Sequence, residues 1–150
     1  MAIRNILKAS EHNEFLRKKS KIVNDVKSIY DLLDDLWETL HHANGAGLAA
    51  PQVGILKRVA VVEIDGLKLE LINPIIIEKS DEQVIQTEGC LSFPNQWGKV
   101  ARPKMVKVET LDRQGNKKTI TATDWQARAI CHEVEHLDGI LYVDNVLEEE

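Results

Sequence analysis

The chain has 150 residues, of which 43% are hydrophobic and 29% are charged, a composition that is ordinary for one soluble globular domain. Its formal net charge of -5 and the lack of a basic patch argue against nucleic acid as the main partner. The sequence contains no apolar core of signal-peptide length and no stretch near the roughly 20 apolar residues that span a membrane. Two cysteines without the spacing of a disulfide framework fit a reducing compartment, so we expect a cytoplasmic protein.

A long amphipathic helix is predicted over residues 25–42. Asn24 precedes it as an N-cap residue, and Gly45 lies just past its end. Apolar side chains recur along it at helical spacing, and we expect them to be core contacts: Val26, Ile29, Tyr30, Leu32, Leu33, Leu36, Trp37 and Leu40.

The segment after this helix, residues 45–54, holds three of the eight glycines together with small residues. Such a bare backbone can approach a ligand, whereas the plainer interpretation is a helix C-cap followed by a turn. A phosphate loop is disfavoured because no Gly-Lys-Ser/Thr ending is present. A dinucleotide fingerprint is disfavoured because the glycines follow a helix rather than a strand.

Short strands are predicted through the middle of the chain, and two of them alternate as a hairpin around the turn at residues 112–116. The predicted strands are residues 58–64, 67–72, 75–78, 83–86, 105–111 and 118–121, with a last short one at residues 140–143. No repeat or interdomain linker is present. We therefore expect one domain over residues 1–150 with an α+β fold, in which two main helices are enclosed by small, mainly antiparallel sheets.

Cys90 lies in the short run Glu88-Gly89-Cys90-Leu91-Ser92. The glycine lets the backbone come close to another element, and a lone thiol in a reducing compartment is a soft metal ligand. The alternative is a cysteine that is simply packed in the core.

The second helix is predicted to carry the most informative residues, His132-Glu133-Val134-Glu135-His136. Thr123 to Gln126 forms a capping box, Gly139 is a stop signal, and Trp125, Ala129, Ile130, Val134 and Leu137 supply an apolar stripe on about 14 residues. Imidazoles four positions apart stack on one side of a helix, where both can reach one metal ion. Glu133 beside them is placed to handle the proton of a water molecule.

A catalytic metal site with one open position needs a third protein ligand. The candidates are His12, His41, His42, the carboxylates, Cys90 and Cys131. Cys131 directly precedes His132 and points about 100° away on a helix, so it is better interpreted as a small buried hydrophobe.

The three segments, in this order and at these distances, resemble the signature motifs of the peptide deformylases. The first motif is matched at Gly45, Gly47, Ala49, Ala50 and Gln52, the second at Glu88, Gly89, Cys90 and Ser92, and the third at His132, Glu133 and His136. The resemblance extends to residues 3–7, to Leu16 and Arg17, and to Arg102, so it covers essentially the whole chain.

This resemblance implies an enzyme that removes the N-formyl group from the initiator methionine of new polypeptides and releases formate. It implies that Cys90, His132 and His136 hold one divalent metal ion, with the fourth position free for water, and that Glu133 is general base and then general acid. Oxyanion donors would be the Gln52 amide and the Leu91 backbone N–H. The ion implied is Fe²⁺, with Zn²⁺, Ni²⁺ and Co²⁺ also able to bind.

A substrate site is expected beside the metal. The resemblance implies that Gly45, Ala46 and Gly47 bind the peptide backbone as a strand would. Counting back along the helix from His132 gives Ala129, Arg128 and Trp125 as the wall of a hydrophobic methionine pocket. We expect the Arg128 stem to line its rim while the guanidinium reaches solvent.

The chain departs from the family at two positions of its third motif, with Glu135 where Asp is commonest and Cys131 where Gln is. Glu135 is expected to affect the orientation of a metal ligand rather than the reaction. Residues 148–150 end the chain without the long C-terminal helix of many members, so ribosome docking is not assumed. Two alternatives remain, a zinc peptidase and a purely structural metal site, and a thiolate ligand with only three nominated protein ligands disfavours both.

Overall fold

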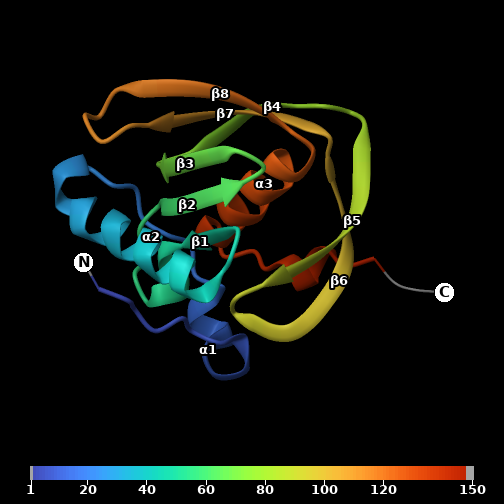
Figure 1. Cartoon of the computed structure of the whole chain (residues 1–150), viewed down its shortest axis with the longest axis horizontal. Helices are drawn as coiled ribbons and strands as arrows, with labels where there is room; N and C mark the ends of the chain where they lie inside the picture. The colour runs from blue at the N-terminus through green and yellow to red at the C-terminus, as the bar shows by residue number, and fades with distance from the viewer. Residues whose placement is uncertain (1, 148–150) are drawn as a thin grey trace.

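A computed structural model describes residues 2–147 and consists of small antiparallel sheets wrapped around one central helix (Figure 1). The α-helices are α1 (Ala9–Leu16), α2 (Tyr30–Ala43) and α3 (Asp124–Leu137). The strands are β1 (Gly47–Ala49), β2 (Val59–Ile64), β3 (Leu67–Ile72), β4 (Ile75–Lys79), β5 (Gln83–Cys90), β6 (Phe93–Pro103), β7 (Met105–Leu111) and β8 (Lys117–Thr123). The expected α+β class with antiparallel sheets is confirmed.

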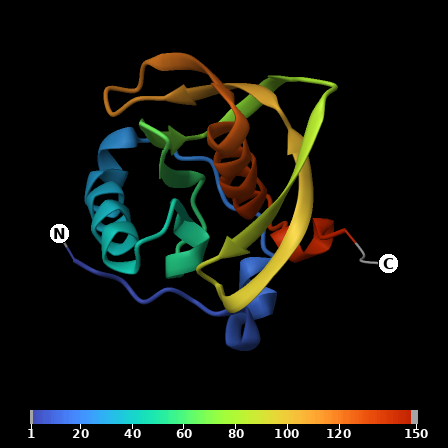
Figure 2. The same cartoon turned by 45° about the vertical axis from the view of Figure 1, so that its right-hand side comes forward.

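The strands form three sheets, each joined by antiparallel pairs. Their orders are β1-β2-β3, β4-β7-β8 and β5-β6. A tight turn at Asp65 and Gly66, both with positive φ, connects β2 to β3 and matches the right-handed twist of a hairpin. The β5-β6 pair is a long curved arm that passes in front of α3 in Figure 2.

Helix α3 is the centre of the molecule because its apolar face meets two sheets. Ile130, Val134 and Leu137 pack with Ala60 and Val62 of β2 and with Val106 and Val108 of β7 in one core cluster. Burying side chains of this size stabilises the fold by about 1.5–3 kcal/mol each. The helix ends at Leu137, and two residues later Gly139 has a φ of 75° and no room for a Cβ beside the Arg17 carbonyl oxygen, so the predicted stop just after Leu137 and Asp138 is confirmed.

Helix α2 packs on the face of the β1-β2-β3 sheet that is opposite to the face covered by α3. Its residues Leu33, Leu36 and Leu40 are fully buried with Leu48 and Val61. A 3₁₀ turn at Val26–Ile29 precedes α2, and Asp25 caps that turn by accepting a hydrogen bond from the Lys27 N–H, so the prediction of Asn24 as the cap was wrong. The helix ends with Asn44 in the left-handed conformation, one residue before Gly45.

Some sequence expectations fail for identifiable reasons. Residues 140–143 are not a strand, because Tyr142–Asn145 forms a 3₁₀ turn. The Thr123 side chain caps no N–H, and the Gln126 amide instead donates to the Asp65 carbonyl, so there is no capping box. Helix α1 and strands β1 and β6 are present without having been predicted. Within residues 2–147, the helices are too short or too polar to cross a membrane.

Candidate metal centre

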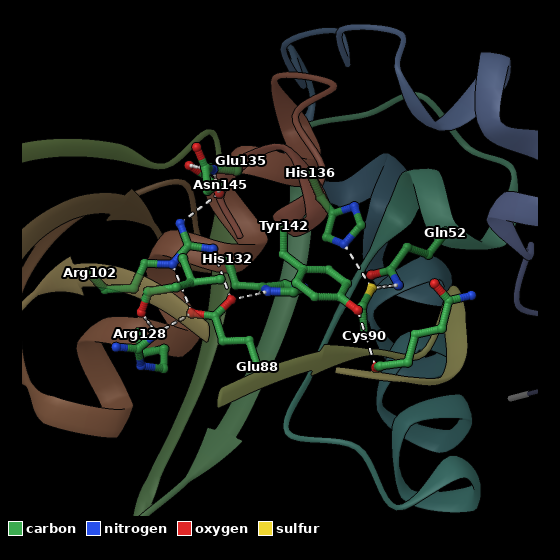
Figure 3. Close-up of polar contacts among 12 residues, drawn as sticks. Gln52, Glu88, Cys90, Arg102, Arg128, His132, Glu135, His136, Tyr142 and Asn145 are labelled. Carbon is green, nitrogen blue, oxygen red and sulfur yellow. Dashed lines mark hydrogen bonds and ion pairs between the residues drawn. The ribbon is translucent and has the colours of Figure 1, made fainter. Parts of the chain in front are cut away.

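Cys90, the last residue of β5, lies against two histidines of α3. Its Sγ is 3.3 Å from Nε2 of His136, and the His132 and His136 rings have centroids 5.1 Å apart (Figure 3). The helical spacing of four stacks the two rings, while the β5-β6 arm carries the thiol to them. The predicted cluster is therefore brought together by two elements that are distant in sequence.

One donor atom from each of Cys90, His132 and His136 lies within 4.8 Å of the others, and within the described residues this is the one group of its kind. A thiolate and two imidazoles suit a transition-metal ion. His132 places its Nδ1 against Glu88 Oε1 at 3.1 Å, which leaves Nε2 free for a metal. The donor set therefore fits one divalent ion with an open position.

The other candidate ligands lie elsewhere. His12 and His42 are exposed, and exposed His41 contacts Glu63 at 2.6 Å. Cys131 is buried, and burial raises the pKa of its thiol to about 11, which agrees with the interpretation of a small hydrophobe.

Glu133 is buried beside this cluster without a partner for its charge. Its Oε1 has no hydrogen-bond partner among the described residues, and burial raises the pKa of Glu133 to about 7. The other oxygen occupies the space where a Cβ at position 47 would lie, so only glycine allows β1 to pass so close. Glu133 therefore lines the cleft with a pKa that lies near neutral pH.

Glu88 is buried to a similar extent, but it is surrounded by charged partners. Arg102 donates two hydrogen bonds to it, Nε to Oε2 at 2.8 Å and Nη2 to Oε1 at 2.9 Å, and Arg128 adds a third at 2.6 Å. Burial alone would raise the pKa of Glu88, but Arg102 and His132 lower it to about 2. Glu88 therefore stays ionised and fixes the His132 ring.

Glu135 joins this network from the next turn of α3. It accepts a hydrogen bond from Arg102 Nη1 at 2.6 Å and contacts the Asn145 amide. Because Arg102 also binds Glu88, Glu135 reaches His132 only through two intermediate side chains.

Gln52 sits in the short 3₁₀ turn Ala50–Val53 that follows β1 and is 1% exposed. Its Oε1 accepts from the Ala49 N–H at 3.0 Å, which fixes the amide orientation. Its Nε2 donates to Ser92 Oγ at 3.1 Å and lies 3.5 Å from Cys90 Sγ. The carboxamide nitrogen thus faces the metal cluster.

A cleft of about 600 Å³ opens beside Cys90, His132 and Glu133, whereas Gln52 and His136 are not among its lining residues. It is lined by the predicted site residues Gly45, Ala46, Gly47, Cys90, Leu91, Trp125, Arg128, Ala129, His132 and Glu133. The prediction that the Arg128 guanidinium reaches solvent was wrong. Its side chain is buried and donates to Glu88 and to the carbonyls of Val84 and Val100, since a buried guanidinium needs such partners.

Two residues of the site were missed by sequence reasoning. Tyr142 stacks on the His132 ring, with centroids 5.9 Å apart, and its hydroxyl donates to the Gln96 carbonyl at 3.2 Å (Figure 3). Trp97 of β6 also lines the cleft. Neither lies in a motif, and only their aromatic character near the motifs could have drawn attention.

Helix-borne imidazoles with a nearby cysteine on a strand, a buried glutamate and an open cleft are characteristic of a metal-dependent hydrolase. A family model described as polypeptide deformylase matches residues 3–150. The chain belongs to this family, whose members are metal-dependent enzymes that remove the N-formyl group from nascent chains. The chain is accordingly a metallohydrolase that acts on formylated polypeptides.

Named relatives agree with this placement. The chain is 52% identical over 149 residues to a peptide deformylase of Acetivibrio thermocellus, covering 98% of this chain and 85% of the relative. It is 49% identical over 148 residues to one from Caldicellulosiruptor bescii, covering 98% and 87%. The solved peptide deformylase of Thermotoga maritima superposes with a TM-score of 0.93 at 32% identity, covering 99% and 100%. That of Ehrlichia chaffeensis in complex with actinonin gives 0.92 at 36% identity, covering 99% and 91%.

Proposed function

We propose that Cys90, His132 and His136 hold one divalent metal ion and that N-formylmethionyl peptides bind in the cleft before them. The observation that carries this proposal is the buried Glu133, whose Oε1 has no hydrogen-bond partner within residues 2–147, next to a three-donor cluster of which Cys90 and His132 line the same cleft. A bound divalent ion would lower the pKa of water and polarise the formyl carbonyl. The ion proposed for the cell is Fe²⁺, with Zn²⁺, Ni²⁺ and Co²⁺ able to substitute, because thiolate and imidazole suit all four.

Glu133 is proposed to move the protons of the reaction. It accepts a proton from the water that attacks the formyl carbon, and it returns that proton to the amine nitrogen as the carbon–nitrogen bond breaks. Formate and a free N-terminal methionine are the products. A pKa of about 7 suits both halves of this role, since a group that must take and give a proton works best near ambient pH.

The oxyanion is proposed to be stabilised by the Gln52 amide and the backbone N–H of Leu91. The Gln52 nitrogen already lies near Cys90, and the Ala49 N–H and Ser92 hydroxyl hold it there, so little reorganisation is needed. Leu91 follows Cys90 directly and is positioned by the same strand end. A neutral amide can donate a hydrogen bond to the developing negative charge without adding a charge of its own.

The substrate backbone is proposed to lie along Gly45, Ala46 and Gly47 as an added strand. A Cβ at Gly45 would be 2.8 Å from Leu91 Cδ1 and 2.9 Å from Leu40 Cδ1, so a side chain there would have to displace these methyl groups. The methionine side chain would enter the cleft beside Ala129, Trp125 and the aliphatic stem of Arg128, whose charge is already neutralised by Glu88. Such a lining suits an apolar side chain.

The same proposal places the protein in the cytoplasm, where new polypeptides arise and where its two free cysteines stay reduced. Residues 1–150 are proposed to act as one catalytic domain. Contact with the ribosome would be transient, and no direct binding to nucleic acid is proposed, since the net charge is -5.

The test is formate release from formyl-Met-Ala-Ser by protein purified without oxygen, beside the same peptide without its formyl group. Release of formate from the first peptide, with the second left uncut, is expected. Cleavage of the unformylated peptide would instead indicate a peptidase.

Metal analysis of Cys90→Ser tests the ligand set. We expect the variant to lose most of its metal, because a hydroxyl replaces the soft thiolate. Wild-type metal content together with wild-type activity in Cys90→Ser would contradict the assignment.

A further inference from the structure

Trp97 is a large aromatic side chain that is 67% exposed and yet lines the cleft. A second tryptophan, Trp125, is 40% exposed and lines the same cleft from α3. Leaving two such rings in contact with water forgoes a large hydrophobic gain. Aromatic side chains that are exposed around a binding cleft are typical of surfaces that a ligand covers.

The Trp97 ring has a defined position because it packs on the facing strand. A Cβ added at Gly89 of β5 would lie 2.9 Å from both Cδ1 and Nε1 of Trp97, so the indole rests directly on bare backbone. Gly89 immediately precedes the proposed metal ligand Cys90. The ring is therefore held one residue away from the metal cluster, at the outer side of the cleft.

The face of the arm that carries Trp97 leads outward from the cleft. Thr87 pairs with Lys99 and Ile85 with Ala101, and residues that are directly opposed or two apart share a face of the sheet. Thr87 lines the cleft, and Ile85 on the same face is 55% exposed. A peptide leaving the cleft along this face meets Trp97 first and Ile85 further out.

We infer that Trp97 is a specificity-determining residue, which contacts the side chain of one of the two residues that follow formyl-methionine and favours an apolar one. This inference rests on the proposed function. With the formyl group at the cluster and the methionine beside Ala129, an extended peptide advances about 3.3 Å per residue, so its next residues pass the ring. The expected preference is about three- to tenfold in kcat/KM, the range of one aromatic contact.

The experiment compares formyl peptides with matched changes at each position. The second residue is Phe or Gln in formyl-Met-Phe-Ser and formyl-Met-Gln-Ser, and the third is Phe or Gln in formyl-Met-Ala-Phe and formyl-Met-Ala-Gln. The measured quantity is the ratio of kcat/KM for Phe over Gln in wild type, Trp97→Ala and Trp97→Phe. Ile22→Ala is the control, because Ile22 is also 67% exposed but is not part of the cleft.

In wild type and in Ile22→Ala we expect a ratio of about three to ten at one of the two positions. The ratio should fall to about one in Trp97→Ala and be largely restored in Trp97→Phe. A wild-type ratio near one at both positions, or the same ratio in Trp97→Ala, would overturn the inference while formyl-Met-Ala-Ser is still cleaved. Failure of wild type to release formate from formyl-Met-Ala-Ser would overturn the proposed function, and this inference with it.

Discussion

Two glutamates near His132 are almost equally buried but differ in their hydrogen-bond partners and in their pKa values. Glu133 is 4% exposed, faces the cleft and has no partner for one oxygen among the described residues. Glu88 is 5% exposed, belongs to β5 and is bound by two arginines and by His132. The pKa of the first is raised to about 7 and that of the second is lowered to about 2.

The difference shows that partners, rather than burial, decide what a buried carboxylate does. A carboxylate without a counter-charge is costly to keep ionised and therefore gains and loses a proton readily. A carboxylate held by two guanidinium groups is locked as an anion and can only position its neighbours. Changes to the proposed reacting groups should therefore affect rate, and changes to the Glu88 ion-pair network should affect stability and metal affinity.

The largest effect on stability is expected from Glu88→Gln. Removing one charge of a buried pair typically costs about 3–5 kcal/mol in the free energy of unfolding. We expect about 3 kcal/mol here, because Arg102 keeps Glu135 and Arg128 keeps two backbone carbonyls. Metal affinity should also fall by about 10- to 100-fold, since His132 loses its anchor.

Urea unfolding of the metal-free protein and chelator competition measure the two effects separately. At saturating metal, kcat should stay within a few-fold of wild type. If Glu88→Gln had the wild-type unfolding free energy but a greatly reduced kcat, the roles given to the two glutamates would have to be exchanged.

Substitutions of Gln52 test the proposed oxyanion donor. Loss of one oxyanion donor costs about 2.7–4 kcal/mol of transition-state stabilisation, roughly 10²- to 10³-fold in kcat. We expect Gln52→Ala to show this loss and Gln52→Glu to be worse, because a carboxylate repels the developing charge. Deformylation rates at matched metal content provide the measurement, and near-wild-type rates in both variants would show that the donor is unnecessary.

The smallest effect is expected from a similar ion-pair network at the surface. Arg113 binds Glu70 at 2.7 Å and Asp34 at 2.9 Å, but these side chains are 32%, 22% and 36% exposed. Arg113→Ala should therefore cost less than about 1 kcal/mol of unfolding free energy, because solvent screens exposed pairs. Metal affinity should not change. A cost as large as that of Glu88→Gln would show that burial does not separate the two networks.

Sequence periodicity was sufficient for α2, α3 and the hairpin strands, since these elements bury one regular face. It could not find β6, whose first half is mostly exposed, contains Pro94, Asn95 and Gly98, and has no alternation before Val100. It also missed β1, which is only three residues long and is defined by its pairing with β2. Elements that depend on partners distant in the chain leave little local signal.

The candidate site divides in the same way. Residues within motifs, such as Cys90, His132 and Gln52, were found because their spacing is chemically constrained. The salt-bridge role of Arg128 was misjudged because helical counting gives a direction and not a partner. Trp97 approaches the site from β6 and Tyr142 from the 3₁₀ turn Tyr142–Asn145, so only the folded arrangement connects them with it.

The most direct test measures kcat, metal content and unfolding free energy for Glu133→Gln beside Glu88→Gln. The amide keeps the size of Glu133 but cannot accept the proton, so we expect kcat to fall at least about 100-fold. Metal content and unfolding free energy should remain close to wild type, because Glu133 Oε1 has no hydrogen-bond partner to lose among residues 2–147. A Glu133→Gln variant that retained more than about a tenth of the wild-type kcat would contradict the assignment of Glu133 as the proton-transfer group.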